Sequence, residues 1–196
     1  MPNWCENDIV ITGPEADLEA MLKLFGGDAI DASRPAVLDF DKIVPYPQRF
    51  KDLDEHASAE QERIDNLPGA ERDGHLAACG RPKNGFLQGG NRWCVENWGT
   101  KLPARGTSAV SRSPGRMEAT FYTAWSPPIP AIMAASRRFP TLLFDITFYE
   151  RGNKFEGHAL VENGEKRMES SGYYGGSRGG CIRPGDASDA AQALPH

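Results

Sequence analysis

The stretch RMEATFYTAWSPPIPAIMAASRRFP, from Arg116 to Pro140, determines which fold we expect. Apolar residues alternate with polar ones through its first part, which is the pattern of a β-strand with one buried face. Prolines then precede a run in which Ile129, Ile132 and Met133 recur at helical spacing. The stretch therefore predicts a strand followed by a helix.

The sequence on either side extends this plan. TLLFDITFYERGNKFEGHALVE, residues 141–162, predicts two strands joined by a turn at Arg151-Gly152-Asn153. Near the amino end, NDIVITG predicts a strand, EADLEAMLKLFGG a helix and VLDFDKIVPYP a second strand. Two strand–helix–strand units make an α+β, ferredoxin-like (split βαβ) fold, with an antiparallel sheet, helices on one face and an extra C-terminal strand. The term describes topology only, because the cysteine spacing does not suit an iron–sulfur cluster.

Two changes of composition set the domain boundaries. Between about residues 50 and 100, a charged, helix-prone stretch and a glycine-rich loop predict a mostly helical insertion between the two units. From Gly164 the chain is rich in Gly and Ser and has no periodic apolar pattern, which is typical of a disordered tail. We therefore expect a single domain over residues 1–163 and a disordered tail over 164–196.

The chain has 196 residues and a net charge of −5, which argues against a broad phosphate-binding surface. It has no apolar run of membrane-spanning length, so we expect a cytoplasmic protein without a membrane partner. Its cysteines, Cys5, Cys79, Cys94 and Cys181, are widely spaced, so we expect free thiols and neither a metal site nor a cofactor. The sequence carries no signal for an oligomeric state.

Strand alternation leaves one face of the predicted sheet without helices. In this topology the first, third and fourth main strands are neighbours, which places Asp8, Glu118 and Asp145 on that face with Tyr122 and Tyr149. One hypothesis is an RNA-binding face with Tyr122 as the stacking residue, although the acidic residues would repel phosphate. Another is a polymerase-palm-like Mg²⁺ site formed by Asp8 and Glu118 on parallel strands, although no phosphate-binding loop accompanies them.

The repeated strings WCEN at Trp4 and WCVENWGTK at Trp93 suggest a third interpretation. If the insertion folds over the open face, its tryptophans pack beside the aromatic residues of the sheet, and asparagines supply amide donors and acceptors. The candidate cleft then consists of Asn3, Trp4, Asn7, Trp93, Asn97, Trp98, Lys101, Tyr122, Trp125 and Tyr149. The competing interpretation is that these groups cap strand ends and bond to the backbone, as buried asparagines usually do.

Four segments also resemble a known family. PNWCEN near the amino end, ENWGTK at Glu96–Lys101, TAWSPPIP at Thr123–Pro130 and FYERGNKFEG at Phe148–Gly157 are similar to segments of the Api92-like, or YubB-like, proteins of phages, plasmids and enterobacteria. The resemblance covers roughly residues 1–165. It implies a ferredoxin-like domain and a mobile-element origin, and it brings no established activity and no catalytic residues.

These observations lead us to expect a non-catalytic binding protein of a phage or plasmid type mobile element, which engages a host or phage protein through the Trp- and Asn-rich cleft. The sequence contains no P-loop, no clustered His or Cys ligands and no recognisable nucleophile–histidine motif. Two alternatives stay open. One is a small-ligand or enzymatic pocket at the same cleft, and the other is a nucleic-acid-associated module that uses the open sheet face and is disfavoured by the acidic charge.

Overall fold

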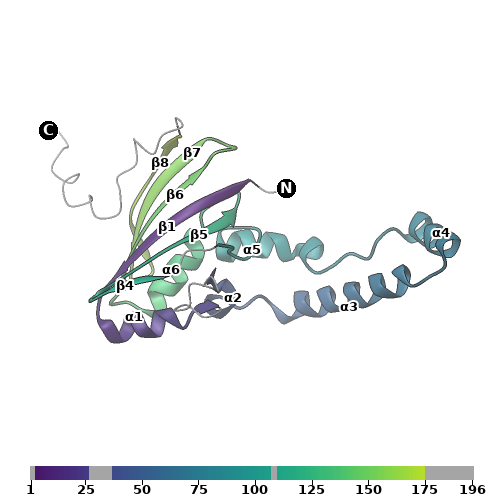
Figure 1. Ribbon diagram of the computed structural model, residues 1–196, viewed down its shortest axis with the longest axis horizontal. Helices are drawn as coiled ribbons and strands as arrows, with labels where there is room; N and C mark the ends of the chain where they lie inside the picture. Colours follow the sequence, from purple (N-terminus) through teal and green to yellow (C-terminus); the bar gives the residue numbers. More distant parts are fainter. Residues whose placement is uncertain (1–2, 27–36, 107–109, 175–196) are drawn as a thin grey trace.

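The structure is a computed structural model that describes residues 3–26, 37–106 and 110–174. Its centre is an antiparallel sheet with the strand order β4-β5-β1-β6-β7-β8 (Figure 1). The strands are β1 (Trp4–Thr12), β4 (Ser111–Ser113), β5 (Arg116–Ala124), β6 (Leu143–Glu150), β7 (Phe155–Glu162) and β8 (Glu165–Tyr173). Helix α6 (Ile129–Arg138) connects β5 to β6, and β1 pairs between these two strands. The ferredoxin-like α+β fold predicted from the sequence is confirmed.

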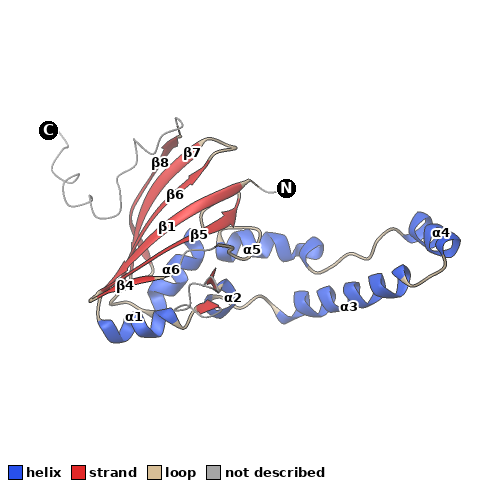
Figure 2. Cartoon of the chain, viewed as in Figure 1, coloured by secondary structure: helices blue, strands red, loops and turns tan. Residues whose placement is uncertain are grey.

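Helices α1 (Glu15–Leu22), α2 (Phe40–Ile43), α5 (Asn91–Trp98) and α6 lie on one face of the sheet, and the other face carries no helix of the described chain (Figure 2). The apolar alternation of the central strands points toward these helices, as predicted. The buried residues of this set are Ile9, Ile11, Met117, Ala119, Phe121, Phe144, Ile146 and Phe148. Burial of this apolar surface is the main force that holds the helices on the sheet.

The first half of the fold differs from the prediction. Its expected second strand is reduced to β3 (Val37–Leu38), which pairs with β2 (Phe25–Gly26) in a separate small sheet. The reason lies in Asp39, whose side chain accepts a hydrogen bond of 3.0 Å from the backbone N–H of Asp41 and so caps helix α2. In the main sheet, β1 lies between β5 and β6, which helix α6 joins as a crossover pair running in the same direction, and β1 runs antiparallel to both. The expected parallel pairing of the first and third strands is therefore wrong.

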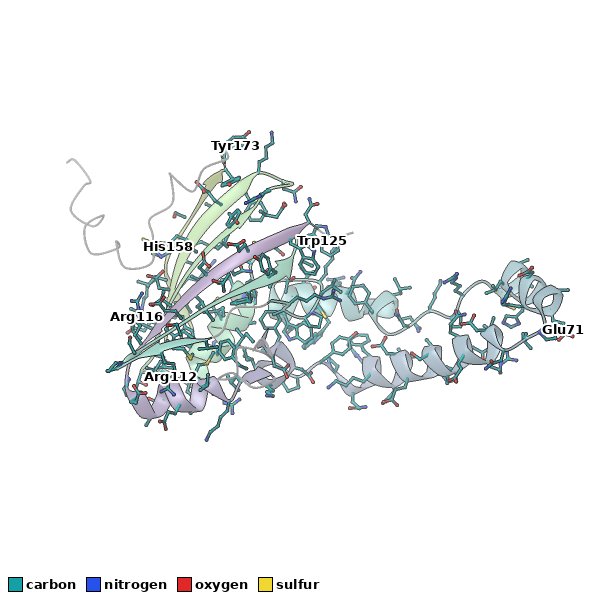
Figure 3. All side chains as sticks on the ribbon, viewed as in Figure 1. Glu71, Arg112, Arg116, Trp125, His158 and Tyr173 are labelled. Carbon is teal, nitrogen blue, oxygen red and sulfur yellow. The ribbon has the colours of Figure 1, made fainter. Side chains whose placement is uncertain are left out.

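The insertion is helical, as predicted, but it does not fold over the open face. Helices α3 (Gln48–Asp65) and α4 (Gly69–Cys79) extend away from the sheet as an arm, and Glu71 lies near the far end of this arm (Figure 3). The chain returns through η1 (Phe86–Gly90) to α5, which packs against α6 on the helix-covered side. A Cβ at Gly85 would lie 2.2 Å from the carbonyl oxygen of Phe50, so a glycine is needed where the returning chain meets α3.

The segment after Gly164 also differs from the prediction, because residues 165–173 form the edge strand β8. Asn163 and Gly164 both have a positive φ, as a tight hairpin turn of type I′ requires. The side chains of β8 are mostly exposed and polar, so its pairing with β7 rests on backbone hydrogen bonds rather than on a buried apolar face. The rest of the predicted tail, residues 175–196, lies outside the described residues.

Candidate functional site

The structure separates the predicted cleft into two groups of residues on opposite faces of the sheet. Trp98 is only 4 % exposed, and its Nε1 donates a hydrogen bond of 2.8 Å to the carbonyl oxygen of Val44. Its ring packs against Tyr46 and Trp93, with centroids 5.8 and 5.5 Å away. Asn97 donates from Nδ2 to the backbone oxygen of Trp93. The expectation that these tryptophans pack beside the aromatic residues of the open face is therefore wrong, because α5 lies under the other face.

Asn7 also lies outside the predicted cleft. It is fully buried in β1 on the helix-covered face, between Cys5 and Ile9. Its Nδ2 donates to the backbone oxygens of Cys5 and Phe121, at 3.0 and 3.3 Å, and to Oγ1 of Thr123 at 2.9 Å. For this residue the structure matches the competing interpretation, in which a buried asparagine bonds to the backbone.

The other predicted residues gather at one end of the open face. Asn3, Trp4, Tyr122 and Tyr149 line a hollow of about 490 Å³ there. The hollow is completed by Glu6, Glu150, Arg151 and Gly152. Strand register explains this gathering, because Glu6 of β1 lies directly opposite Tyr122 on β5 and Tyr149 on β6. Side chains directly opposite in antiparallel strands share a face.

Glu6 is held between the two tyrosines. The hydroxyl of Tyr149 donates a hydrogen bond of 2.7 Å to Oε2 of Glu6. Burial raises the pKa of Tyr122, and the negative charge of Glu6 and a hydrogen bond with Glu6 raise it further. Both phenols therefore fix a carboxylate in the hollow. Glu6 was not among the residues predicted for the cleft, although it is part of the quoted WCEN string and alternates onto the same face as Trp4 and Asp8.

Two arginines of the chain itself lie over aromatic rings of the hollow. The guanidinium carbon of Arg105 lies 5.6 Å from the ring centroid of Trp4, and that of Arg151 lies 5.7 Å from the centroid of Tyr149. Arg105 is fixed by two backbone hydrogen bonds with Tyr122, of 2.8 and 2.5 Å. Distances below about 6 Å are those of cation–π attraction. The aromatic walls of the hollow therefore already accept guanidinium groups.

Trp125 lies beside the hollow, at the end of the sheet where β1 begins (Figure 3). Its φ of 68° lies in the left-handed region, which is uncommon for a bulky residue. Its backbone N–H donates to the carbonyl oxygen of Asn3 at 2.9 Å. The ammonium of Lys101 lies 4.9 Å from the centroid of its ring. Both Lys101 and Trp125, predicted to belong to the site, thus flank the hollow without lining it.

The turn between β6 and β7 forms one wall of the hollow. Glu150, only 1 % exposed, accepts hydrogen bonds from the backbone N–H groups of Gly152 and Asn153 and so fixes the turn. A Cβ at Gly152 would lie 2.2 Å from Nδ2 of Asn3. Glycine at this position therefore allows the turn to approach the amino end of β1 closely.

The carboxylates considered for Mg²⁺ lie on the open face, but on antiparallel strands. Asp8 is opposite Thr120, whose Oγ1 donates to it at 2.6 Å, and Glu118 lies 2.5 Å from Nε of Arg116. The parallel pairing on which the palm-like hypothesis depended is not formed. Within the described part of the chain, no group of three or more His, Cys, Asp or Glu side chains is placed to hold a metal ion.

A buried histidine on the same face was also missed by the sequence analysis. His158 is 1 % exposed, and its Nε2 lies 2.6 Å from Oδ1 of Asp145. It alternates onto the open face with Glu156, which is 7 % exposed. The open face of the sheet outside the hollow therefore carries carboxylates on several strands.

Comparison with known proteins supports the family resemblance. Residues 107–175 match a family described as "Ferredoxin-like domain in Api92-like protein". The structure is similar to the crystal structure of protein Api92 from Yersinia pseudotuberculosis, with a TM-score of 0.52 and 14% sequence identity, over 90% of this chain and 99% of that one. No curated protein matches the chain.

In the described residues, no helix has both the length and the apolar character needed to cross a membrane. The family match covers strands β4 to β8 and helix α6, which are the second strand–helix–strand unit, β5-α6-β6, with the strand before it and the two strands after it. Residues 107–175 of this chain therefore match the ferredoxin-like domain of the Api92-like proteins, and the resemblance predicted from the sequence is confirmed for this part of the chain.

Proposed function

We propose that the protein is a non-catalytic binding protein of a phage or plasmid type mobile element, and that it engages a host or phage protein through the hollow at the end of the open sheet face. The observation that carries this proposal is the set of half-buried aromatic rings, Trp4, Tyr122 and Tyr149, around an open hollow. Tryptophan and tyrosine are the usual anchors of protein interfaces, because they bury a large area at a small cost in side-chain entropy.

The shape and charge of the face favour a protein over the two alternatives. A small-ligand pocket encloses most of its ligand, whereas this hollow lies on a sheet face that no described helix covers. Nucleic acid is disfavoured because Glu6, Asp8 and Glu118 follow one another on this face and repel phosphate. The enzymatic alternative has less support, because the histidine of the open face, His158, is buried against Asp145 and does not line the hollow.

The proposal is tested by affinity capture from a bacterial lysate with three forms of the full chain. Trp4→Ala removes a ring of the hollow, and Val95→Ala is the matched control, because Val95 is 41% exposed on α5, outside the hollow. We expect a defined set of proteins to be captured by the wild type and the control and lost with Trp4→Ala. A protein identified in this way is then purified, and its affinity is measured against all three forms.

Circular dichroism establishes that each form is folded. If all three folded forms capture the same proteins with the same affinity, the hollow is not the interface. If no protein binds but a metabolite mixture changes the fluorescence of the wild type and not of Trp4→Ala, the small-ligand alternative replaces the proposal.

A further inference from the structure

We infer that the outer edge of strand β8 binds the same edge of a second copy of the chain, so that two sheets join into one across a two-fold axis. This inference concerns a surface other than the hollow and does not depend on the proposed function, because none of the residues that line the hollow belongs to β8. Its basis is a long strand edge that has no partner strand in the described chain, together with the distribution of charge along that edge.

The two edges of the main sheet differ in how well they are protected against pairing with another chain. Strand β4, at one edge, has only three residues and is followed by Pro114. Strand β8, at the other edge, has nine residues, and no strand of the described chain pairs with its outer side. An open edge of this length is a place where another chain adds a strand, and charges, prolines and bulges are the features that prevent it.

Features that prevent pairing are concentrated in the first half of β8. Lys166 and Arg167 are exposed there, and the register with β7 shifts at this point, as in a β-bulge. Over residues 169–173 the register is regular, and the segment contains no proline, lysine or arginine. The second half of β8 is therefore the part that can accept a strand.

The hydrogen bonds with β7 identify the backbone groups that this half offers. In an antiparallel pair, alternate residues direct both N–H and C=O toward the partner strand, and the residues between them direct both away from it. The N–H of Tyr174 donates to the carbonyl oxygen of Lys154, just before β7, at 2.8 Å, so the even-numbered residues of 170–174 face β7. The residues that direct their N–H and C=O groups outward are then Glu169, Ser171 and Tyr173.

These outward groups are self-complementary in a second copy that runs antiparallel. When Ser171 lies opposite Ser171 of the second copy, Glu169 lies opposite Tyr173, and each outward group meets a partner. Glu169, which is paired with Lys166 of its own strand, then approaches a cation of the other copy, because the ammonium of Lys154 lies 6.0 Å from the ring centroid of Tyr173. A register with Glu169 at the axis would instead place two like charges opposite each other, which is destabilising.

Tyr173 supplies the apolar contact of this edge. It is 71% exposed and lies at the end of β8 that is remote from the helices (Figure 3). Tyrosine is a usual anchor of protein interfaces. Directly opposite side chains share a face, so the open faces of both copies form one continuous face that carries both hollows. Because a strand pair of this length is small beside a standard interface of roughly 1,600 Å², we expect a dimer that dissociates on dilution.

Disulfide trapping tests the surface and the register together. The background is the full chain with Cys79 and Cys181 replaced by serine, in which Cys5 and Cys94 stay buried. Ser171→Cys is introduced at the axis, where opposite Cα atoms about 5.5 Å apart suit a disulfide, and Ser113→Cys on the other edge is the matched control. We expect Ser171→Cys to form a covalent dimer at least about tenfold faster under mild oxidation. Equal rates, or no dimer from Ser171→Cys, overturn the inference.

Two proline variants test the backbone hydrogen bonds by different effects. Ser171→Pro removes an N–H that points outward, so we expect it to abolish the concentration-dependent dimer in sedimentation velocity while the monomer stays folded. Ser170→Pro removes an N–H that bonds to β7, so we expect it to lower the melting temperature. Ser171→Thr keeps the N–H and should dimerise like the wild type.

A wild-type chain that stays monomeric at all concentrations, or a folded Ser171→Pro variant that dimerises like the wild type, contradicts the inference. If Ser171→Pro does not fold, the disulfide rates decide alone. The proposed function is judged separately by the captured proteins: if the chain is monomeric and Trp4→Ala still loses a partner, the function stands and only the strand pairing falls.

Discussion

Truncation of Trp98 and of Trp4 should have clearly different consequences, because these two tryptophans lie on opposite faces of the sheet. Trp98 is 4 % exposed in the core, whereas Trp4 is half-buried at the hollow. A tryptophan side chain buries about 150–250 Å², which at roughly 25 cal/mol per Å² corresponds to about 4–6 kcal/mol. Trp98→Ala also leaves the carbonyl of Val44 without its 2.8 Å donor, which adds roughly 1 kcal/mol.

Because this area is an upper estimate and alanine keeps part of it, we expect Trp98→Ala to lower the free energy of unfolding by about 3–5 kcal/mol, the range of large aromatic truncations. We expect Trp4→Ala to lower it by at least about 2 kcal/mol less. The assay is urea unfolding followed by far-ultraviolet circular dichroism, which does not depend on the deleted chromophore. If Trp98→Ala does not fold, Trp98→Phe keeps most of the ring packing and loses the hydrogen bond, with an expected cost of about 1–2 kcal/mol. Equal losses for Trp98→Ala and Trp4→Ala would refute the assignment of the two residues to core and site.

Two further predictions concern single positions in the core and on the surface. Gly157→Ala should lower stability by about 1–3 kcal/mol, because its Cβ would lie 2.4 Å from Cζ of Phe148, whereas Gly172→Ala meets nothing within 4 Å and should stay within about 0.5 kcal/mol of the wild type. Thermal unfolding of both variants checks this pair, and equal melting temperatures would contradict it. Burial raises the pKa of Cys5 to about 12, so in single-thiol variants at pH 8 a disulfide reagent should label the exposed Cys79 in the native protein and Cys5 only after unfolding. Because the folded pKa of Cys5 lies above its ordinary value of 9.0, its contribution to stability is complete below about pH 9 and is lost as the pH rises toward about 12, and Cys5→Ala should lack this part of the alkaline loss.

The strands of the main sheet could be predicted where apolar residues alternate along the sequence and the same residues are buried in the fold. Ile9 and Ile11 alternate in β1, and both are buried as expected. The alternation alone does not predict the burial of Asn7. A polar residue at a core-facing position is taken for a surface residue until its hydrogen-bond partners on β5 are known. Those partners are more than a hundred positions away along the chain.

Only part of the predicted cleft lies together in the structure, for a similar reason. Trp4 and Trp98 have the same side chain, and only the path of the inserted arm decides which face each one meets. Composition predicts that the insertion is helical, but it does not specify the direction in which α3 leaves the domain. Strand β8 was missed because an edge strand needs no apolar alternation, although the Asn163-Gly164 pair was a usable turn signal.

The most direct measurement of the central claim is site-specific photocrosslinking to a captured partner. A photoreactive phenylalanine analogue replaces Tyr122 in the hollow in one form and Leu87 in another, because Leu87 is 65% exposed in η1, on the helical insertion. We predict a crosslink to the partner from position 122 and none from position 87. A crosslink from position 87 and none from position 122 would contradict the claim, and it would assign the interface to the helical insertion.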